Sequence, residues 1–285
     1  MSLLAHPRRA RAAAVSAAVL LIAVACVKVP YTNRSQFNVV PAGIMNSIGK
    51  SSYESVLAES RVVKKTEDSE VLRKVGGRIS SVADQPNYDW SYALIQSEDA
   101  NAWCMPGGYI AFYTGILPVL ENEAGMAFVM GHEVGHAVAH HGAERMSQQL
   151  GVLGGLTALE IFLSGSGKMT DEQRGMIMAA AGMGAQLGVV LPFSRTHEKE
   201  ADIIGMMFMA DSGYPPMESV VVWDRMEALV GKSGPAFAST HPSFDARKEN
   251  QEEWMPEAKK RFLRNKLEYD TRATLWTAGA AASSP

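Results

Sequence analysis

The stretch His132-Glu133-Val134-Gly135-His136 decides how the rest of this chain is interpreted. Each residue of an α-helix advances by about 100°, so two histidines four positions apart face the same way. Two imidazoles placed like this can hold one tetrahedral metal ion, most often zinc. The glutamate between them points beside such an ion, where it could take a proton from a water molecule bound there. The stretch therefore predicts a catalytic metal site on a helix, provided that other parts of the chain complete it.

Two further histidines follow closely, but helix geometry excludes them as ligands of the same ion. A catalytic zinc needs a third protein ligand and an open position for water. A continuous helix would carry His140 about 12 Å along its axis from His132, and His141 farther still. They could complete the site only after a break in the helix. The extended pattern HExxHxxGxxH is absent, because Ala139 and Gly142 stand at its Gly and His positions.

Glu198 is a better candidate for the third ligand. It lies four residues before Asp202, so the two carboxylates share one face of a predicted helix. That face also carries Ala201 and Gly205, whose small size would let another helix come close, whereas Glu200 lies on the opposite side. A carboxylate that follows a ligand by one turn can accept a hydrogen bond from a ligand imidazole, as metal sites favour. On these residues alone, a solvated charged surface remains the alternative interpretation.

Several motifs lie between about residues 101 and 247. They are the five-residue stretch quoted above, His141-Gly142-Ala143-Glu144-Arg145, Ser194-Arg195 with Glu198, Ala201-Asp202, Asn101-Ala102-Trp103, Pro106-Gly107-Gly108, and His241-Pro242 with Arg247. Together they resemble the HtpX-type, or CAAX-protease-like, zinc metallopeptidases, which are gluzincins. The stretch Ala23-Val24-Ala25-Cys26, which resembles a lipobox, and Arg34-Ser35-Gln36 make the chain most similar to the periplasmic lipoprotein members of that family.

The resemblance implies a fold and a set of catalytic roles. The fold would be α+β and mainly helical, a zincin-type metallopeptidase domain with a small β-sheet whose edge strand borders the active-site helix. One Zn²⁺ per chain would be held by His132, His136 and Glu198, with Glu133 as the general base. Asp202 would orient a ligand histidine.

The resemblance also implies how a substrate would be bound. His241 and Arg247 would lie near the cleft and steady the developing oxyanion. The aromatic-rich strand that follows two glycines would pair along its edge with an extended substrate. The residues of this strand expected to bind substrate are Gly108, Tyr109, Ile110, Ala111 and Phe112.

Hydrophobic periodicity and turn residues divide the rest of the chain. We expect a metallopeptidase domain over residues 53–270 and a disordered tail over residues 271–285. The metal-site helix should begin after Pro118. Strands are predicted at 90–96 and 107–114, and further helices at 53–64, 66–75, 194–211, 216–230 and 249–270.

The N-terminus has the composition of an export signal. Three arginines precede an uncharged, Ala-rich run that ends at Ala23-Val24-Ala25-Cys26. This end resembles a bacterial lipobox, so residues 1–25 are predicted to be a lipoprotein signal peptide. Cys26 would carry the lipid, and residues 26–52 would form a tether. Val27 after the cysteine favours an anchor in the outer membrane that faces the bacterial periplasm.

Two apolar stretches, residues 150–163 and 175–193, are interpreted as buried or interfacial helices. The second has no charge along its length, so a membrane span remains an alternative. Against a span stand its four glycines, together with Gln186 and Pro192, which leave the stretch only weakly apolar for its length.

Cys104 is the only thiol besides Cys26, and we interpret it as a buried free thiol. The deformylases, another class of HExxH enzyme, use a cysteine as the third metal ligand. That alternative would leave Glu198 and Asp202 without a role.

Composition limits the remaining function classes. A chain of 285 residues with 47% hydrophobic residues and a formal net charge of −3 can bury one sizeable core, and nothing in this balance suggests nucleic-acid binding. The metal-site motifs and the resemblance together predict a zinc endopeptidase that cleaves unfolded or misassembled envelope proteins. The alternative from another class is a chaperone or assembly factor that binds such proteins through the edge strand and seldom cleaves them.

Overall fold

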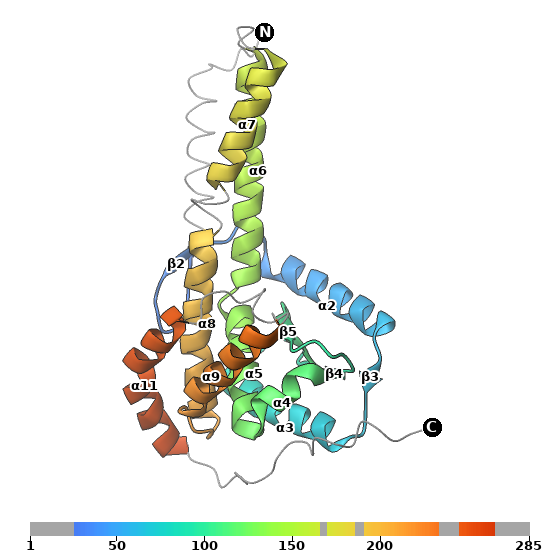
Figure 1. Ribbon diagram of the computed structural model, residues 1–285, viewed down its shortest axis with the longest axis vertical. Helices are drawn as coiled ribbons and strands as arrows, with labels where there is room; N and C mark the ends of the chain where they lie inside the picture. Colours follow the sequence, from blue (N-terminus) through green and yellow to red (C-terminus); the bar gives the residue numbers. More distant parts are fainter. Residues whose placement is uncertain (1–25, 166–169, 186–190, 234–244, 266–285) are drawn as a thin grey trace, which may run out of the picture.

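The computed structural model describes residues 26–165, 170–185, 191–233 and 245–265 (Figure 1). The predicted α+β, mainly helical class is confirmed. The strands are β1 (Cys26–Lys28), β2 (Ser35–Phe37), β3 (Val62–Val63), β4 (Ser91–Ile95), β5 (Ala102–Met105) and β6 (Tyr109–Tyr113). The helices are α2 (Ala42–Glu59), α3 (Glu67–Val82), the 3-10 helix η1 (Thr114–Ile116), α4 (Leu117–Leu120), α5 (Glu123–Val138), α6 (His141–Gly165), α7 (Asp171–Ala185), α8 (Leu191–Asp211), α9 (Glu218–Ser233) and α11 (Asp245–Asn265).

Helix α5, which carries the metal-site stretch, lies at the centre of the core. It begins where the side chain of Asn122 accepts a hydrogen bond of 2.9 Å from the backbone N–H of Gly125, a typical N-cap. Every residue of α5 is buried. Its apolar side chains pack against α3, α8 and α9, and Phe128 meets Trp223 of α9 edge to face at 5.6 Å.

Helices α5 and α8 approach each other so closely that only glycine fits at the contact. A Cβ atom added at Gly205 of α8 would lie 2.6 Å from the backbone nitrogen of His132. One added at Gly131 of α5 would lie 2.7 Å from the carbonyl oxygen of Gly205. The prediction that Ala201 and Gly205 allow a close helix contact is therefore confirmed.

The four-stranded sheet corrects the prediction of the substrate-binding strand. Its order is β3-β4-β6-β5, with β4 and β6 parallel and the other pairs antiparallel. Because β6 is paired on both sides, it cannot bind a substrate by edge pairing, and β5 is the outer strand next to α5. The correction applies to Gly108 before β6 and to Tyr109, Ile110, Ala111 and Phe112 within it.

A sequence signal for β5 was present but missed. Gly107 and Gly108 have φ values of +94° and +92° and join two short apolar runs. Adjacent glycines between such runs are a typical β-hairpin signal, because they adopt positive φ without steric cost. The run Ala102–Met105 is therefore the first strand of a hairpin, in which β5 pairs with β6.

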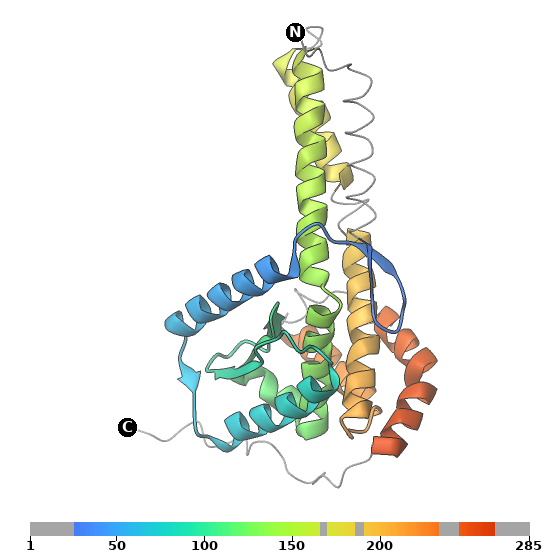
Figure 2. The same ribbon diagram turned by 180° about the vertical axis from the view of Figure 1, so that it is seen from behind.

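The segment over residues 26–52 is folded, which differs from the expected tether. It contains the β1–β2 hairpin and the first part of α2. Helix α2 begins near the lower part of α6 and runs along the sheet (Figure 2). The side chain of Gln36 donates a hydrogen bond of 2.7 Å to the carbonyl of Ala139. Val29 and Met45 of the segment are buried as well, but such scattered apolar residues form no periodic pattern that would predict a folded segment. The predicted segments 1–25 and 271–285 lie outside the described residues.

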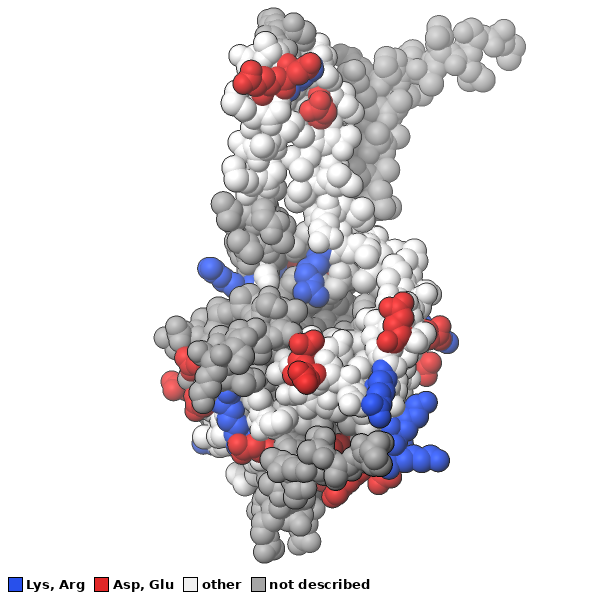
Figure 3. All heavy atoms as spheres, turned by 45° about the vertical axis from the view of Figure 1, so that its right-hand side comes forward, with Lys and Arg blue, Asp and Glu red and all other residues white. Residues whose placement is uncertain are grey.

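Helices α6 and α7 form an arm that projects from the body (Figure 1). On the face shown in Figure 3, charged side chains lie near the far end of the arm, and the visible described surface between that end and the body is uncharged. Most described residues of the stretches 150–163 and 175–193 are exposed, so the prediction of buried helices is wrong for them, whereas the interfacial alternative stays a prediction. No described helix is long and apolar enough to cross a membrane. The exposed large apolar side chains of the arm are Leu150, Leu153, Ile161, Phe162, Met176, Ile177 and Met183.

Replacing Gly205 by Ala should lower the free energy of unfolding by about 1–3 kcal/mol, because the added methyl group overpacks the α5–α8 contact. Urea denaturation measures the change. The control is Gly77→Ala in α3, where an added Cβ meets nothing within 4 Å. This control should stabilise the protein by up to about 1 kcal/mol through helix propensity. Equal effects of the two substitutions would contradict the packing argument.

Candidate metal centre

The three predicted metal ligands are brought together by α5 and α8. His132 and His136 of α5 place their Nε2 atoms 3.1 Å apart. The carboxylate of Glu198 on α8 lies 3.6 Å from Nε2 of His132 and 3.4 Å from Nε2 of His136. One ligand atom from each residue lies within 4.8 Å of the others, and all three residues are buried. Among the described residues, no other group of His, Cys, Asp and Glu has this geometry.

Hydrogen bonds indicate which nitrogen of each histidine carries the proton and which one faces the site. Nδ1 of His132 lies 2.9 Å from the carboxylate of Asp202, which can only accept, so Nδ1 carries the proton. Nε2 of His141 likewise donates to Glu200 at 3.0 Å, so Nδ1 of His141 accepts from Nδ1 of His136 at 2.9 Å. Both ligand histidines therefore direct the lone pair of Nε2 into the site.

This arrangement fits a cation. Two imidazole lone pairs 3.1 Å apart repel each other unless a positive ion lies between them. Oε2 of Glu198 is buried and accepts no hydrogen bond from the described residues, although Nη2 of Arg247 forms an ion pair with it at 3.3 Å. Burial raises the pKa of Glu198 to about 8, although the Arg247 guanidinium opposes this shift. A carboxylate held in such a place is stabilised by a proton or by a bound metal ion.

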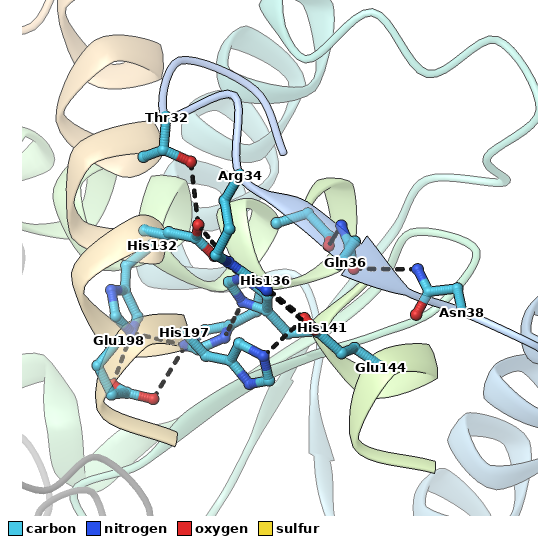
Figure 4. A network of polar contacts seen from close by, with 12 residues as sticks. Thr32, Arg34, Gln36, Asn38, His132, His136, His141, Glu144, His197 and Glu198 are labelled. Atoms are coloured by element: carbon cyan, nitrogen blue, oxygen red, sulfur yellow. Dashed lines mark hydrogen bonds and ion pairs between the residues drawn. The ribbon is translucent and has the colours of Figure 1, made fainter. Parts of the chain in front are cut away.

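A buried polar network behind His136 was not foreseen from the sequence (Figure 4). Arg34 of the N-terminal segment donates to Glu144 of α6 at 2.7 and 2.8 Å and to Glu200 of α8 at 2.8 and 2.9 Å. Nε2 of His197 lies 2.8 Å from Glu144. Burial alone would raise the pKa of both carboxyls, but the hydrogen bonds from Arg34 and the histidines lower each pKa to about 2.

A helix break explains the place of His141. Helix α5 ends at Val138, and His140 takes a left-handed φ of +54° before α6 begins. This turn brings the ring of His141 back to His136 instead of carrying it along the helix axis. Burial lowers the pKa of His141 to about 3, so the ring is neutral at neutral pH. His141 is therefore no ligand in this geometry but supports one.

Glu133 lies where the predicted general base should lie. It faces a cavity of about 280 Å³ whose lining includes His136, Arg145 and the β5 residues Trp103 and Cys104. The backbone N–H of Cys104 donates a hydrogen bond to its carboxylate, which ties the base to the outer strand. Burial raises the pKa of Glu133, and the neighbouring Glu198 carboxylate adds to the shift. Cys104 itself is not part of the ligand group.

Arg247 lies behind the ligands and not at the surface of the cleft. Its guanidinium donates to Asp202 at 2.7 and 2.8 Å and lies 3.3 Å from Glu198. It stacks 3.7 Å above the ring of Trp223 and is 1% exposed. These contacts favour a positioning role for Arg247 over the predicted contact with an oxyanion. His241, the other residue predicted for that role, lies outside the described residues.

Comparison with known proteins gives matches along most of the chain. The model of peptidase family M48 matches residues 66–255. Mitochondrial metalloendopeptidase OMA1 of Schizosaccharomyces pombe is 33% identical over 235 residues, which cover 81% of this chain and 66% of the relative. The bovine enzyme of that name is 32% identical, over 60% of this chain and 34% of the relative. The Beta-barrel assembly-enhancing protease of Escherichia coli is 25% identical, over 63% of this chain and 37% of the relative. The chain thus spans about two thirds or less of the length of these relatives.

These relatives correct the predicted location. OMA1 relatives from two yeasts, a plant and cattle are named as mitochondrial proteins and not as proteins of a bacterial periplasm. The predicted bacterial periplasm, with a lipid anchor on Cys26 in the outer membrane, is therefore wrong. The composition of residues 1–25 does not discriminate between locations, because segments with arginines and without Asp or Glu are typical of mitochondrial transit peptides as well as of export signals.

Replacing His141 by Phe should weaken Zn²⁺ binding by about 10–100-fold, because His136 loses the acceptor that fixes its tautomer. Competition with a chromophoric chelator measures the affinity, and circular dichroism checks the fold. The control is His140→Asn, which keeps a residue that tolerates the left-handed turn. Equal affinities of the parent and His141→Phe would show that the His136–His141 contact does not support the ligand.

The metal-free protein should lose stability as the pH falls from about 4.5 toward 2. The pKa of Glu144 is about 2 when folded and 4.5 as a free side chain, so the unfolded chain binds more protons in this window. Glu144→Gln should reduce the pH slope of the unfolding free energy by about one proton. Urea denaturation at several pH values measures it, with Glu160→Gln on the exposed side of α6 as the control. An unchanged slope in Glu144→Gln would contradict the assignment.

Proposed function

This chain belongs to peptidase family M48, and we propose that it is a zinc-dependent endopeptidase acting on unfolded or misassembled proteins. The predicted metalloendopeptidase class is confirmed by the family match and by the names of the relatives. The observation that carries the proposal is the convergence of His132, His136 and Glu198, with Glu133 beside them in a cleft next to β5.

Zinc is the metal that this donor set favours. Two imidazole nitrogens and one carboxylate, with no thiolate in the group, are the ligands of many catalytic zinc sites. When bound, zinc acts as a Lewis acid and lowers the pKa of water to about 7. Asp202 and His141 hold the two imidazoles in the tautomer that such binding needs.

Glu133 supplies the proton transfers. Its carboxylate faces the cavity next to His136, where the attacking water would lie. It takes the proton of this water as the water attacks the scissile carbonyl carbon, and then passes the proton to the departing amine. The hydrogen bond from the backbone N–H of Cys104 holds the carboxylate near the outer strand and thus near a peptide bound there.

The outer strand β5 supports an extended substrate. It is the last strand of the sheet on the side of the metal site, and its residues line the cavity with Glu133. A peptide can add to such an edge only when its own backbone is free, so unfolded or misassembled chains are the substrates that fit. The name Beta-barrel assembly-enhancing protease, carried by a relative, associates proteolysis with assembly and supports this substrate class.

Glu133→Gln should keep bound zinc but lower the rate of casein cleavage by at least about 100-fold, because the amide cannot take up the proton of water. Glu198→Ala should instead lose the metal. Elemental analysis of the purified proteins measures zinc, gel assays of denatured casein measure cleavage, and Glu70→Gln on the exposed side of α3 is the control.

Two results would overturn parts of the proposal. Unchanged cleavage by Glu133→Gln would remove this residue as the base, and full zinc content in Glu198→Ala would remove it as a ligand. A zinc-loaded parent that prevents aggregation of unfolded protein without cleaving it would favour the chaperone alternative.

A further inference from the structure

A second cavity, of about 410 Å³, adjoins the catalytic cleft. It shares the lining residues His136, Cys104 and Arg145 with the cavity that Glu133 faces, so the two cavities are neighbours beside the metal ligands. We propose that this pocket receives one large apolar side chain of the substrate, such as Leu, Met or Phe, next to the bond that is cut. The inference rests on the proposed endopeptidase function and adds the side-chain preference.

The lining of the pocket selects an apolar group. Three segments contribute walls: residues 38–46 before and within α2, the hairpin turn after β5, and the start of α6. A mostly apolar concavity of this size favours an apolar group over a charged one, since burial of an unpaired charge is costly. Its apolar lining residues are Val39, Val40, Pro41, Ala42, Met45, Pro106, Ala137 and Ala143.

The position of the pocket connects it to a peptide on β5. Successive side chains of an extended peptide point to opposite faces, so alternate side chains turn toward the body of the protein. Cys104 of β5 and the metal ligand His136 each line both cavities. A side chain close to the scissile bond can therefore enter the pocket while the peptide backbone lies along the strand.

Packing keeps the pocket formed before a substrate arrives. The backbone N–H of Val39 donates to the hydroxyl of Ser147 on α6 at 3.0 Å. Gly49 of α2 lies against the carbonyl of Pro106 with no room for a Cβ atom. Met45 is only 6% exposed. A preformed apolar pocket discriminates through size, by about 10–200-fold for a difference of one or a few methylene groups.

The first step of the test locates the preferred position. The zinc-loaded parent digests denatured casein, and mass spectrometry of the new termini shows which position beside the cut is enriched in large apolar residues. Two peptides that differ only in Leu or Ala at that position then give kcat/KM. The parent should prefer the Leu peptide by about 10-fold or more.

Variants that fill the pocket should remove this preference. Met45→Trp should lower kcat/KM for the Leu peptide by about 10-fold and leave the Ala peptide within about twofold. Gly142→Ala is a milder second variant, because its added Cβ would meet Met45 and Pro106 at an ordinary 3.7 Å and should not disturb folding. It should shift the preference in the same direction. The matched control is Ile48→Trp in α2. Ile48 is 42% exposed, so this variant should keep the parental preference.

The outcomes separate the pocket from the catalytic proposal. Cleavage without enrichment of apolar residues near the cut, or a Leu preference that both filling variants retain, would overturn the pocket while the peptidase function stands. No cleavage of any substrate by the zinc-loaded parent would overturn the proposed function and this inference with it.

Discussion

The metal centre depends on one packing contact, the close approach of α5 and α8. Gly131 and Gly205 let the two backbones come so near that a methyl group at either position would collide with the other helix. This distance brings a carboxylate of α8 within 3.4 to 3.6 Å of the two imidazoles of α5. Larger residues at the contact would separate the ligands even if every ligand were kept, so the glycines belong to the site as much as the donors do.

The second constraint is the balance of buried charge around that contact. Carboxylates buried without partners would take up protons and lose their function as acceptors. Two arginines provide the balance from opposite sides: Arg247 of α11 binds Asp202, and Arg34 of the N-terminal segment binds Glu144 and Glu200. Arg247 keeps Asp202 ionised, and Asp202 orients the ligand His132. Arg34 keeps Glu200 ionised, and Glu200 orients His141, which contacts the ligand His136. The tautomers of His132 and His136 therefore depend on residues far away in the sequence.

The sequence predicted the parts of this site that have a local signature. A spacing of four residues predicted that His132 and His136 share one face of a helix and that Glu198 and Asp202 share one face of another. Contacts without such a signature were missed: Arg34 and Glu200 meet across 166 residues, and the order of β5 and β6 depends on which strand β4 joins. The assumption of a continuous helix also failed at His140, because a single left-handed residue redirects the chain. Periodicity describes one element at a time, whereas these features arise between elements.

The N-terminal segment joins catalysis to selection of the substrate. Arg34 supports the acceptors behind His136, and residues 38–46, only a few positions later, form one wall of the apolar pocket beside the same histidine. The family model begins its match at residue 66, so both contributions lie outside the part of the chain that it describes. Substitutions in the N-terminal segment can therefore change the pocket, while the ligands and the general base within residues 66–255 stay the same. Because Arg34 holds that segment to α6 and α8, such changes remain limited to those that preserve its two carboxylate partners.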